Sequence, residues 1–317
     1  RGLVGSEMCI RDRLGGRSAP DAGHARAPGG VVIGRWRRLG ATGLLALGLV
    51  SAVGPAAAAP AAATPCYQQC PVVNGWLARR AMTALDNEGF RIGWSSSRRS
   101  ALWVAYELLP EADRREVDPR PKGYTVDVRT RPAVRSESYR GSGFDRGHLA
   151  ANGIVSRFFG PVAQQQAMHM SNIAPQTPRL NRGVWQRLEM AEIDVWLAGA
   201  QRVWVVTGPL WPRRPAQLSG GLPVPDGFYR IWVRERDGRA PTVTAFRVPQ
   251  IVCGDEPPRY FRVPVADIAL AAGLDFGPLE QLDEPELTAA ERRAMDALPL
   301  RYARDFQKTP KPNGCTR

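Results

Sequence analysis

The sequence predicts an α+β domain with a central antiparallel sheet flanked by helices. Short runs of β-branched or aromatic residues, bounded by turn residues, mostly follow one another along the chain. One amphipathic helical pattern is inserted among them, and a turn dipeptide joins two of the runs. Successive strands interrupted by a helix favour an antiparallel sheet with helices on its faces.

The strands are predicted from four segments. Residues 103–106 (WVAY) and 202–206 (RVWVV) are typical of buried strands, and the second is apolar on both faces, which predicts a central position. Residues 228–234 and 242–248 flank Asp237-Gly238, a dipeptide suited to positive φ. These two segments therefore predict a β-hairpin.

A helix is predicted over residues 181–197. Val184, Leu188, Ala191 and Val195 recur at three- and four-residue spacing, which places them on one face of a helix. Residues 263–272 and 288–298 are predicted to form two further helices.

Composition and charge limit the classes of function that the chain can have. The chain has 317 residues and is 44% hydrophobic, enough for one large core. Its net charge is +13, and the first 64 residues, with eight Arg and three acids, leave +8 for the remainder. This excess favours a polyanionic partner, although a soluble cationic protein has the same balance.

The N-terminal segments are predicted to lie outside the folded domain. Residues 1–30 are interpreted as an artefactual extension, because the opening segment RGLVGSEMCIRDR resembles translated adaptor sequence. Residues 31–64 combine a basic, an apolar and a small-residue region, as a signal peptide does. The apolar run, 39–53, is shorter than the roughly 20 residues that span a bilayer, so we expect no retained membrane anchor. A single domain is predicted over 65–317.

Four cysteines remain when Cys9 is set aside with the extension: Cys66, Cys70, Cys253 and Cys315. An even number in a chain with an export signal predicts two disulfides in an oxidising compartment. A zinc site is disfavoured, because no histidine lies near Cys253 or Cys315 at finger spacing.

His148 and His169 are the two histidines beyond the leader, and His148 has the better setting for catalysis. It follows Asp145, Arg146 and Gly147. This segment offers an acid to orient a ring, a cation for an anionic substrate and a glycine for close approach. The same tetrapeptide also fits a histidine without a catalytic role, half-buried and hydrogen-bonded to a neighbouring carboxylate.

A second group of polar residues includes Asn172 in Ser171–Gln176 and Asn181 at the predicted start of the helix. The Asn181 side chain could cap the first turn, or its amide oxygen could bind a hard cation. Glu189 lies eight residues on, roughly 12 Å along the axis on the same side. A water-mediated contact between Glu189 and the cation is therefore expected, which suits Mg²⁺.

Several separated motifs resemble the DNA/RNA non-specific endonuclease family in order and spacing, over roughly 66–315. They are Phe144–His148, Ser171–Gln176, Leu180-Asn181 with Trp185 and Leu188-Glu189, and Val205–Leu210. The resemblance implies a ββα-metal (His-Me finger) nuclease fold, in which a strand delivers the histidine and the following helix delivers the asparagine.

The resemblance also implies roles for individual residues. His148 would be the general base, Asn181 the direct protein ligand to Mg²⁺ (with Mn²⁺ as a substitute), and Glu189 the acid that holds metal-bound water. Asn172 and Arg146 fall on active-site positions. The family's upstream arginine falls in 113–119, where Arg114 is preferred over its neighbour Arg115.

The cysteines resemble the two disulfides of the family's secreted bacterial branch, Cys66–Cys70 and Cys253–Cys315. We therefore expect an exported protein, periplasmic or extracellular.

The predicted function is metal-dependent hydrolysis of phosphodiester bonds in DNA and RNA, both held through the phosphate backbone. Two alternatives stay open: a catalytically silent nucleic-acid-binding module, and a toxin or effector nuclease with an immunity partner. A homodimer and an inhibitor protein are further partners that the sequence leaves open.

Overall fold

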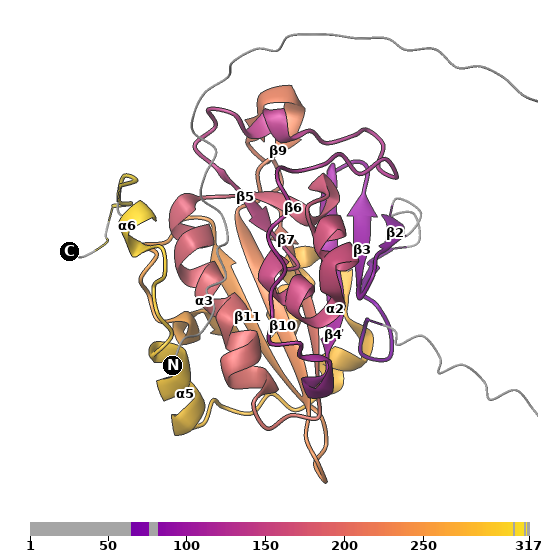
Figure 1. Ribbon diagram of the computed structural model, residues 1–317, viewed down its shortest axis with the longest axis vertical. Coiled ribbons are helices and arrows are strands. Elements are labelled where there is room, and N and C mark those ends of the chain that lie inside the picture. Colours follow the sequence, from indigo (N-terminus) through magenta and orange to yellow (C-terminus); the bar gives the residue numbers. More distant parts are fainter. Residues whose placement is uncertain (1–64, 76–81, 307, 314, 316–317) are drawn as a thin grey trace, which may run out of the picture. The chain divides into compact units, whose positions relative to one another are not determined.

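The computed structural model describes residues 65–75, 82–306, 308–313 and 315, so the predicted extension and leader lie outside the described residues. The centre of this described part is a seven-stranded sheet with antiparallel neighbours throughout (Figure 1). In spatial order the strands are β12 (Arg262–Val263), β11 (Thr242–Pro249), β10 (Gly227–Glu235), β7 (Arg202–Leu210), β4 (Ser100–Leu108), β3 (Phe90–Ser95) and β2 (Met82–Asp86). The prediction of an α+β domain with a central antiparallel sheet is confirmed.

The predicted strands all fall inside this sheet. Residues 103–106 lie in β4, and 202–206 begin β7, the fourth of the seven strands. The predicted hairpin is β10 and β11, joined through Gly238 at a φ of 63°. Strands β2 and β3 were not predicted. Most of β2 faces solvent at the edge of the sheet, so it lacks the apolar alternation that marks a strand.

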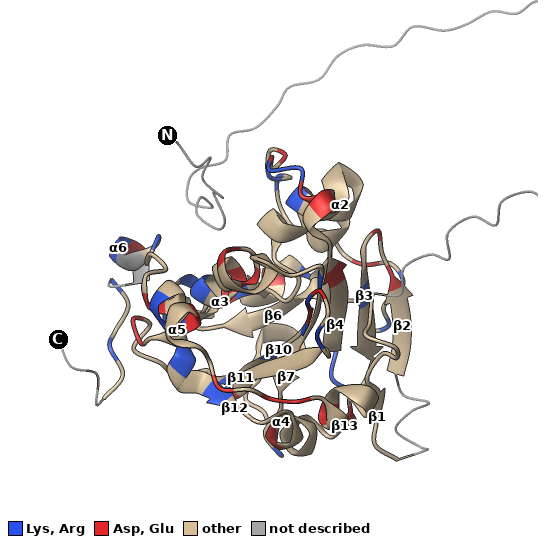
Figure 2. Ribbon diagram, turned by 90° about the horizontal axis from the view of Figure 1, so that it is seen from below, with Lys and Arg blue, Asp and Glu red and all other residues tan. Residues whose placement is uncertain are grey.

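The sheet is buried on both faces because its strands alternate between two apolar cores. On β10, Phe228 and Trp232 face the core shared with the helices α2 and α3, whereas Tyr229 and Ile231 face the core shared with α4. Figure 2 shows α3 and α4 on opposite sides of β7 and β10. A strand covered on both faces reads as a continuous apolar run, as β7 does.

The predicted helix over 181–197 is one continuous helical segment in three parts: η4 (Leu180–Trp185), α3 (Gln186–Ala191) and η5 (Glu192–Leu197). Its predicted apolar stripe is buried. Trp196 also meets Trp232 of β10 edge to face, with ring centroids 4.9 Å apart. Such an aromatic pair contributes roughly 0.5–1.5 kcal/mol beyond its buried area, so it fixes the helix against the sheet.

The other two predicted helices are present as α4 (Val265–Ala272) and α5 (Ala289–Asp296). Helix α2 (Asn152–Ala167) was not predicted, and the reason lies in its middle. Gly160 has a φ of 88° and Pro161 follows it, so the helix is kinked there. A Gly-Pro pair normally ends a helix. In the sequence it divides this helix into two segments that are each too short to predict a helix.

The remaining elements are short. Three strand pairs lie outside the large sheet: β1 (Val72–Val73) with β13 (Leu274–Asp275), β5 (Asp145–His148) with β6 (Ile173–Gln176), and β8 (Gln217–Leu218) with β9 (Leu222–Pro223). The short helices are η1 (Pro110–Ala112), η2 (Ser136–Tyr139), η3 (Met170–Asn172), η6 (Ser219–Gly221), η7 (Pro258–Phe261), η8 (Gly277–Gln281) and α6 (Ala303–Phe306). Within the described residues, no helix has the length and apolarity needed to cross a bilayer.

A fully buried ion pair joins the sheet to the helical segment. Arg230 of β10 donates to Glu192 of η5, and both side chains are completely excluded from solvent. The Tyr106 hydroxyl of β4 donates to the second carboxylate oxygen of Glu192 at 2.7 Å. Arg230 also donates to the carbonyl of Leu149 at 2.9 Å, so its guanidinium connects β10, η5 and the chain just after β5.

We predict that Arg230→Met destabilises the protein by about 3–5 kcal/mol, because it leaves the Glu192 carboxylate buried without its cation. The free energy of unfolding in urea measures this. Arg259→Met is the matched control, since Arg259 pairs with Asp296 at 2.9 Å and both side chains are partly exposed. Its loss is expected to cost much less than that of Arg230, because an ion pair in contact with solvent contributes little to stability. Equal costs for the two substitutions would contradict the prediction.

Candidate active site

The hairpin of β5 and β6 places His148. Its register pairs Asp145 with Gln176 and His148 with Ile173. A side chain at Gly147 would overlap the Gln176 side chain of the partner strand, which explains the glycine before the histidine. Because side chains alternate along a strand, Arg146 and His148 share one face of β5.

The imidazole of His148 is buried and uncharged. Its side chain is 2% exposed, and within the described part of the chain Nε2 has no hydrogen-bond partner. Burial, together with the nearby positive charge of Arg120, lowers the pKa of His148 to about 3. The ring is therefore neutral at physiological pH and has a nitrogen available to accept a proton.

Asn181 is held by Asp145 rather than capping the helix. Its Nδ2 donates to Asp145 Oδ2 at 2.9 Å. A carboxylate only accepts hydrogen bonds, so this contact fixes which way round the amide lies. The amide oxygen Oδ1 accepts no hydrogen bond from the described residues. At the start of the helix it is Thr177 whose Oγ1 accepts a hydrogen bond from the Leu180 N–H.

Asp145 was expected to orient the imidazole, and the structure gives it a different partner. Arg182 donates to both Asp145 oxygens, at 2.7 and 2.6 Å, and Asn181 donates to one of them. Both oxygens of the Asp145 carboxylate thus accept hydrogen bonds from residues of the helical segment. Arg182 lies next to Asn181 in the sequence, and its pairing with Asp145 was not predicted.

Strand β5 and the helical segment touch at two points. Asp145 at the start of the strand contacts Asn181, and the His148 carbonyl at its end accepts from Trp185 Nε1 at 3.2 Å. On the helix the two contacting residues, Asn181 and Trp185, are four positions apart. On the strand, Asp145 and His148 are three positions apart. The strand therefore runs alongside the first turns of the helix, with the base and the amide on neighbouring elements.

Glu189 is buried at the base of the site. It is 8% exposed and makes no hydrogen bond to another described residue. Burial raises its pKa to about 8; Arg230 and Arg120 oppose the rise, and Glu192 adds to it. The carboxyl is therefore largely protonated at neutral pH, and a cation bound nearby would favour its charged form.

Arg146 is packed between two tyrosines. Its guanidinium lies 5.6 Å from the Tyr124 ring and 5.4 Å from the Tyr139 ring, and it donates to the Ser136 carbonyl at 2.8 Å. The Tyr124 ring is also 5.7 Å from the imidazole of His148. Arg146 thus keeps its charge on the face of β5 that carries the histidine.

The Asn172 side chain is bonded to the backbone around the site. The side chain is fully buried, and its amide is used by the backbone: it donates to the Ala150 and Ala167 carbonyls and accepts from the Ala150 N–H. Among the described residues, the hydrogen bonds of this amide do not include one to the His148 imidazole. Asn172 instead holds the segment after His148 against the end of α2.

The structure offers a second candidate for the upstream arginine. Arg114 donates to Asp118 and to the Ser156 carbonyl, both at 3.0 Å, which ties it to the start of α2. The arginine whose charge acts on both His148 and Glu189 is Arg120, which donates to the Tyr124 hydroxyl at 2.9 Å. Arg120 stands between Pro119 and Pro121. That extended setting is the sequence signal that was missed.

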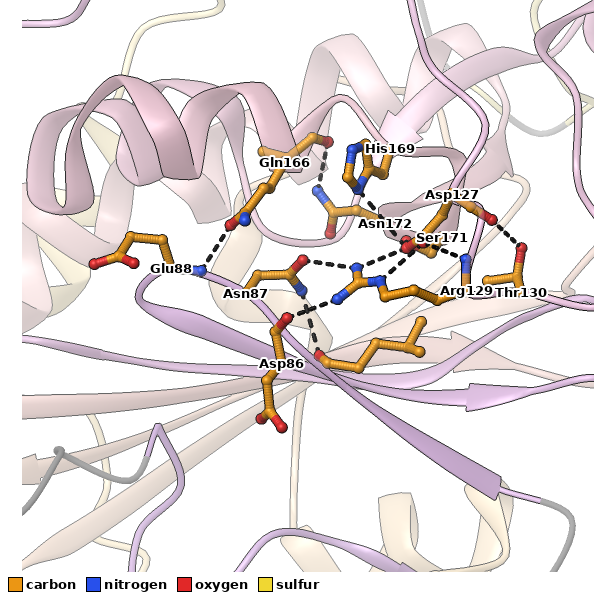
Figure 3. Close-up of polar contacts among 12 residues, drawn as sticks. Asp86, Asn87, Glu88, Asp127, Arg129, Thr130, Gln166, His169, Ser171 and Asn172 are labelled. Atoms are coloured by element: carbon orange, nitrogen blue, oxygen red, sulfur yellow. Dashed lines mark hydrogen bonds and ion pairs between the residues drawn. The ribbon is translucent and has the colours of Figure 1, made fainter. Parts of the chain in front are cut away.

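The second histidine belongs to a separate network (Figure 3). His169 Nδ1 lies 3.7 Å from the Asp127 carboxylate, which accepts from Ser171 at 2.6 Å and from Arg129. Arg129 continues to the turn between β2 and β3, where it donates to Asn87 at 2.8 Å. Burial lowers the pKa of His169 as well, against the pull of Asp127. This network connects the loop that carries Asp127 and Arg129 to the turn between β2 and β3.

Both predicted cysteine pairs are present, Cys66–Cys70 and Cys253–Cys315. The second pair ties the C-terminal segment beside the site. Arg179, just before η4, donates to the carbonyls of Cys253, Thr309 and Pro310. The start of the helix that carries Asn181 is thereby fixed.

Comparison with known proteins identifies the family. The model of the family described as DNA/RNA non-specific endonuclease matches residues 75–281. The chain belongs to this family. Human mitochondrial endonuclease G is 32% identical over 267 residues, which are 78% of this chain and 89% of that protein. Mitochondrial nuclease EXOG of Danio rerio is 31% identical over 209 residues, 60% of this chain and 59% of that protein.

A solved structure agrees in fold. In the crystal structure of the EndoG/EndoGI complex, one chain aligns with a TM-score of 0.57 and 25% identity, covering 63% of this chain and 86% of its own length. The predicted nuclease fold is confirmed by this likeness. The protein is a DNA/RNA non-specific nuclease and hence a hydrolase.

The prediction of an exported, periplasmic or extracellular protein is wrong. Endonuclease G of human and of Bos taurus, and EXOG, are mitochondrial proteins, which conflicts with that location. The prediction relied on a leader that resembles a signal peptide and on cysteine pairs that resemble those of a secreted branch. Arg-rich, acid-poor leaders are shared by more than one kind of targeting segment.

We predict that burial of His148 gives the protein an acid-sensitive stability. Below about pH 6.5 the unfolded chain protonates this histidine, whereas the folded protein excludes the proton down to about pH 3. Stability therefore falls as pH drops through this window, by up to about 1.4 kcal/mol per pH unit for one proton. Urea unfolding of wild type and His148→Asn, in metal-free buffer between about pH 7 and pH 4, measures the difference in slope.

His169→Asn is the control for this measurement. Its pKa is also lowered, but the side chain is about a quarter exposed, so its substitution should change the slope less. Identical slopes for wild type and His148→Asn would contradict the prediction.

Proposed function

We propose that this nuclease hydrolyses phosphodiester bonds of DNA and RNA with His148 as general base and one divalent cation, Mg²⁺ with Mn²⁺ as a substitute, held by Asn181. One observation carries the proposal. Asp145 begins the strand that ends in His148, and it binds the Asn181 amide nitrogen, so the amide oxygen stays available beside the base.

The donor set fits a hard cation. Amide and carboxyl oxygens are the ligands that Mg²⁺ prefers, and Mg²⁺ keeps most of its waters, so few protein ligands are needed. Asn181 Oδ1 would hold the ion directly, and Glu189 would accept hydrogen bonds from water around it. When bound, the cation would supply positive charge that stabilises the phosphate and the departing 3′ oxygen.

His148 removes the proton from the attacking water. Its pKa of about 3 describes the free site, where burial and Arg120 disfavour the charged ring. A phosphodiester bound beside the imidazole brings a negative charge, which favours the protonated ring and strengthens it as a base. The Tyr124 ring, 5.7 Å away, limits how far the imidazole can turn.

Arg120 and Arg146 neutralise the phosphate. Both guanidinium groups lie against the Tyr124 ring, at 5.8 and 5.6 Å, and the imidazole of His148 lies 5.7 Å from the same ring. Charge added to the phosphate in the transition state is stabilised by cations fixed in advance, because they need not reorganise during the reaction. Contacts of this kind engage the phosphate and carry no information about the base or the 2′-hydroxyl.

An inhibitor protein is a further proposed partner. The EndoG chain similar to this one was crystallised with EndoGI in a complex described as a mechanism of EndoG inhibition. We propose that a protein inhibitor also engages this chain.

The central test is cleavage of supercoiled plasmid and of RNA by the disulfide-intact protein, with Mg²⁺ or with EDTA. His148→Ala should lower the rate by roughly 10²–10⁴-fold, because the general base is lost. Asn181→Ala or EDTA should remove activity at low Mg²⁺. His169→Ala is the matched control and should keep the rate within about twofold, since His169 belongs to another network.

Three outcomes would contradict this mechanism. Cleavage that survives EDTA would exclude the cation, and cleavage that survives His148→Ala would exclude the base. Retardation of DNA by the wild-type protein without cleavage would favour the silent binding module.

Arg120→Ala is predicted to lower kcat by about 10²–10³-fold, as expected for loss of one fixed charge at the phosphate. Arg114→Ala is the control, because Arg114 is exposed and bonded to Asp118 and α2. It should change kcat by less than about twofold. A larger loss for Arg114 than for Arg120 would restore the original assignment of the upstream arginine.

A further inference from the structure

Three loops beside the site carry a large excess of arginine. They are residues 96–99, 131–140 and 211–221. Together they contain seven arginines, Arg98, Arg99, Arg131, Arg135, Arg140, Arg213 and Arg214, and one acid, Glu137. We call these loops the arginine platform.

The loops form one surface because Arg99 joins them. Its guanidinium donates to the Gly220 carbonyl in the third loop and, at 3.4 Å, to the Ala133 carbonyl in the second. The guanidinium of Arg98 lies 5.6 Å from the ring of Trp211, which fixes a second cation on the same assembly. η2 and η6 also pack together, and Figure 1 shows this region above β5.

The platform is continuous with the active site. Arg146, on the His148 face of β5, donates to the Ser136 carbonyl of η2. Its guanidinium also rests against Tyr139, the last residue of η2. A strand whose phosphate lay beside His148 and Arg146 would therefore meet the platform next.

The charge of the platform is open to a ligand. Arg131, Arg135, Arg140, Arg213 and Arg214 are all exposed. Arg213 and Arg214 make no ion pair or hydrogen bond with other described residues. Pro212 and Pro215 flank this pair and restrict the backbone around it. Exposed like charges gathered on one surface repel one another and favour a polyanion as partner.

We propose that the arginine platform binds the phosphates of the nucleic-acid strand to one side of the scissile bond. This inference rests on the proposed function. The platform supplies affinity for long polynucleotides, whereas His148, Arg120 and Asn181 supply the chemistry.

The test compares a double variant, Arg213→Glu with Arg214→Glu, with a matched control, Arg239→Glu with Arg247→Glu. Arg239 lies in the turn between β10 and β11, and Arg247 is exposed on the α4 face of β11, so the same charge change is made outside the three platform loops. Each protein is assayed with plasmid at several salt concentrations, and with bis(4-nitrophenyl) phosphate, a diester too short to reach the platform.

The platform variant should raise KM for plasmid by about tenfold or more at about 0.1 M salt, and should reduce the slope of log KM against log salt by roughly 1.4 to 1.8, the value for two lost phosphate contacts. Its kcat on plasmid and its rate on the small diester should match wild type. The control variant should stay within about twofold of wild type in KM.

Failure of this inference differs from failure of the proposed function. A platform variant that matches the control in KM and salt slope would overturn the platform, as expected if these loops bind a protein instead. A platform variant that loses activity on the small diester would also overturn it, because the arginines would then act in the chemistry. A wild-type protein that cleaves neither substrate with Mg²⁺ would overturn the proposed function.

Discussion

The buried ion pair between Arg230 and Glu192 is the interaction on which the site depends. One guanidinium binds the helical segment through Glu192 and the chain after His148 through the Leu149 carbonyl, and it lies 4.5 Å from the ring of Trp185. A buried charge tolerates little displacement, because each lost hydrogen bond leaves a group unsatisfied in a low dielectric. The sheet, the helix and the histidine strand are therefore held in one geometry.

A second ion pair, between Asp145 and Arg182, orients the Asn181 side chain. Asp145 binds Arg182 and Asn181 together, so the carboxylate is fixed by the arginine while it orients the amide. Removing the carboxylate would free the amide to rotate, and either of its ends could then face a cation. Arg230 therefore positions the sheet, the helical segment and the histidine strand, whereas Asp145 orients the Asn181 side chain.

Sequence reasoning found the parts that follow local rules. The central strand β7, the β10–β11 hairpin and the stripe containing Val184 were predicted, because apolar period and turn chemistry are visible in a few residues. Helix α2 was missed, because its packing overrides a Gly-Pro pair. Arg114 was preferred over Arg115 and Arg120 was not considered, because proximity between distant segments is set by the fold and has no local signal.

The site has an unusual balance of charge, and burial explains it. The same exclusion of water lowers the pKa of His148 to about 3 and raises that of Glu189 to about 8, so an expected base and an expected acid are both uncharged at neutral pH. The positive charges near them belong to Arg120 and Arg230, which cannot shed their protons. A phosphate would favour the charged form of the histidine, and a cation would favour that of the glutamate. Each ligand would thus favour the charged form of one of these two residues.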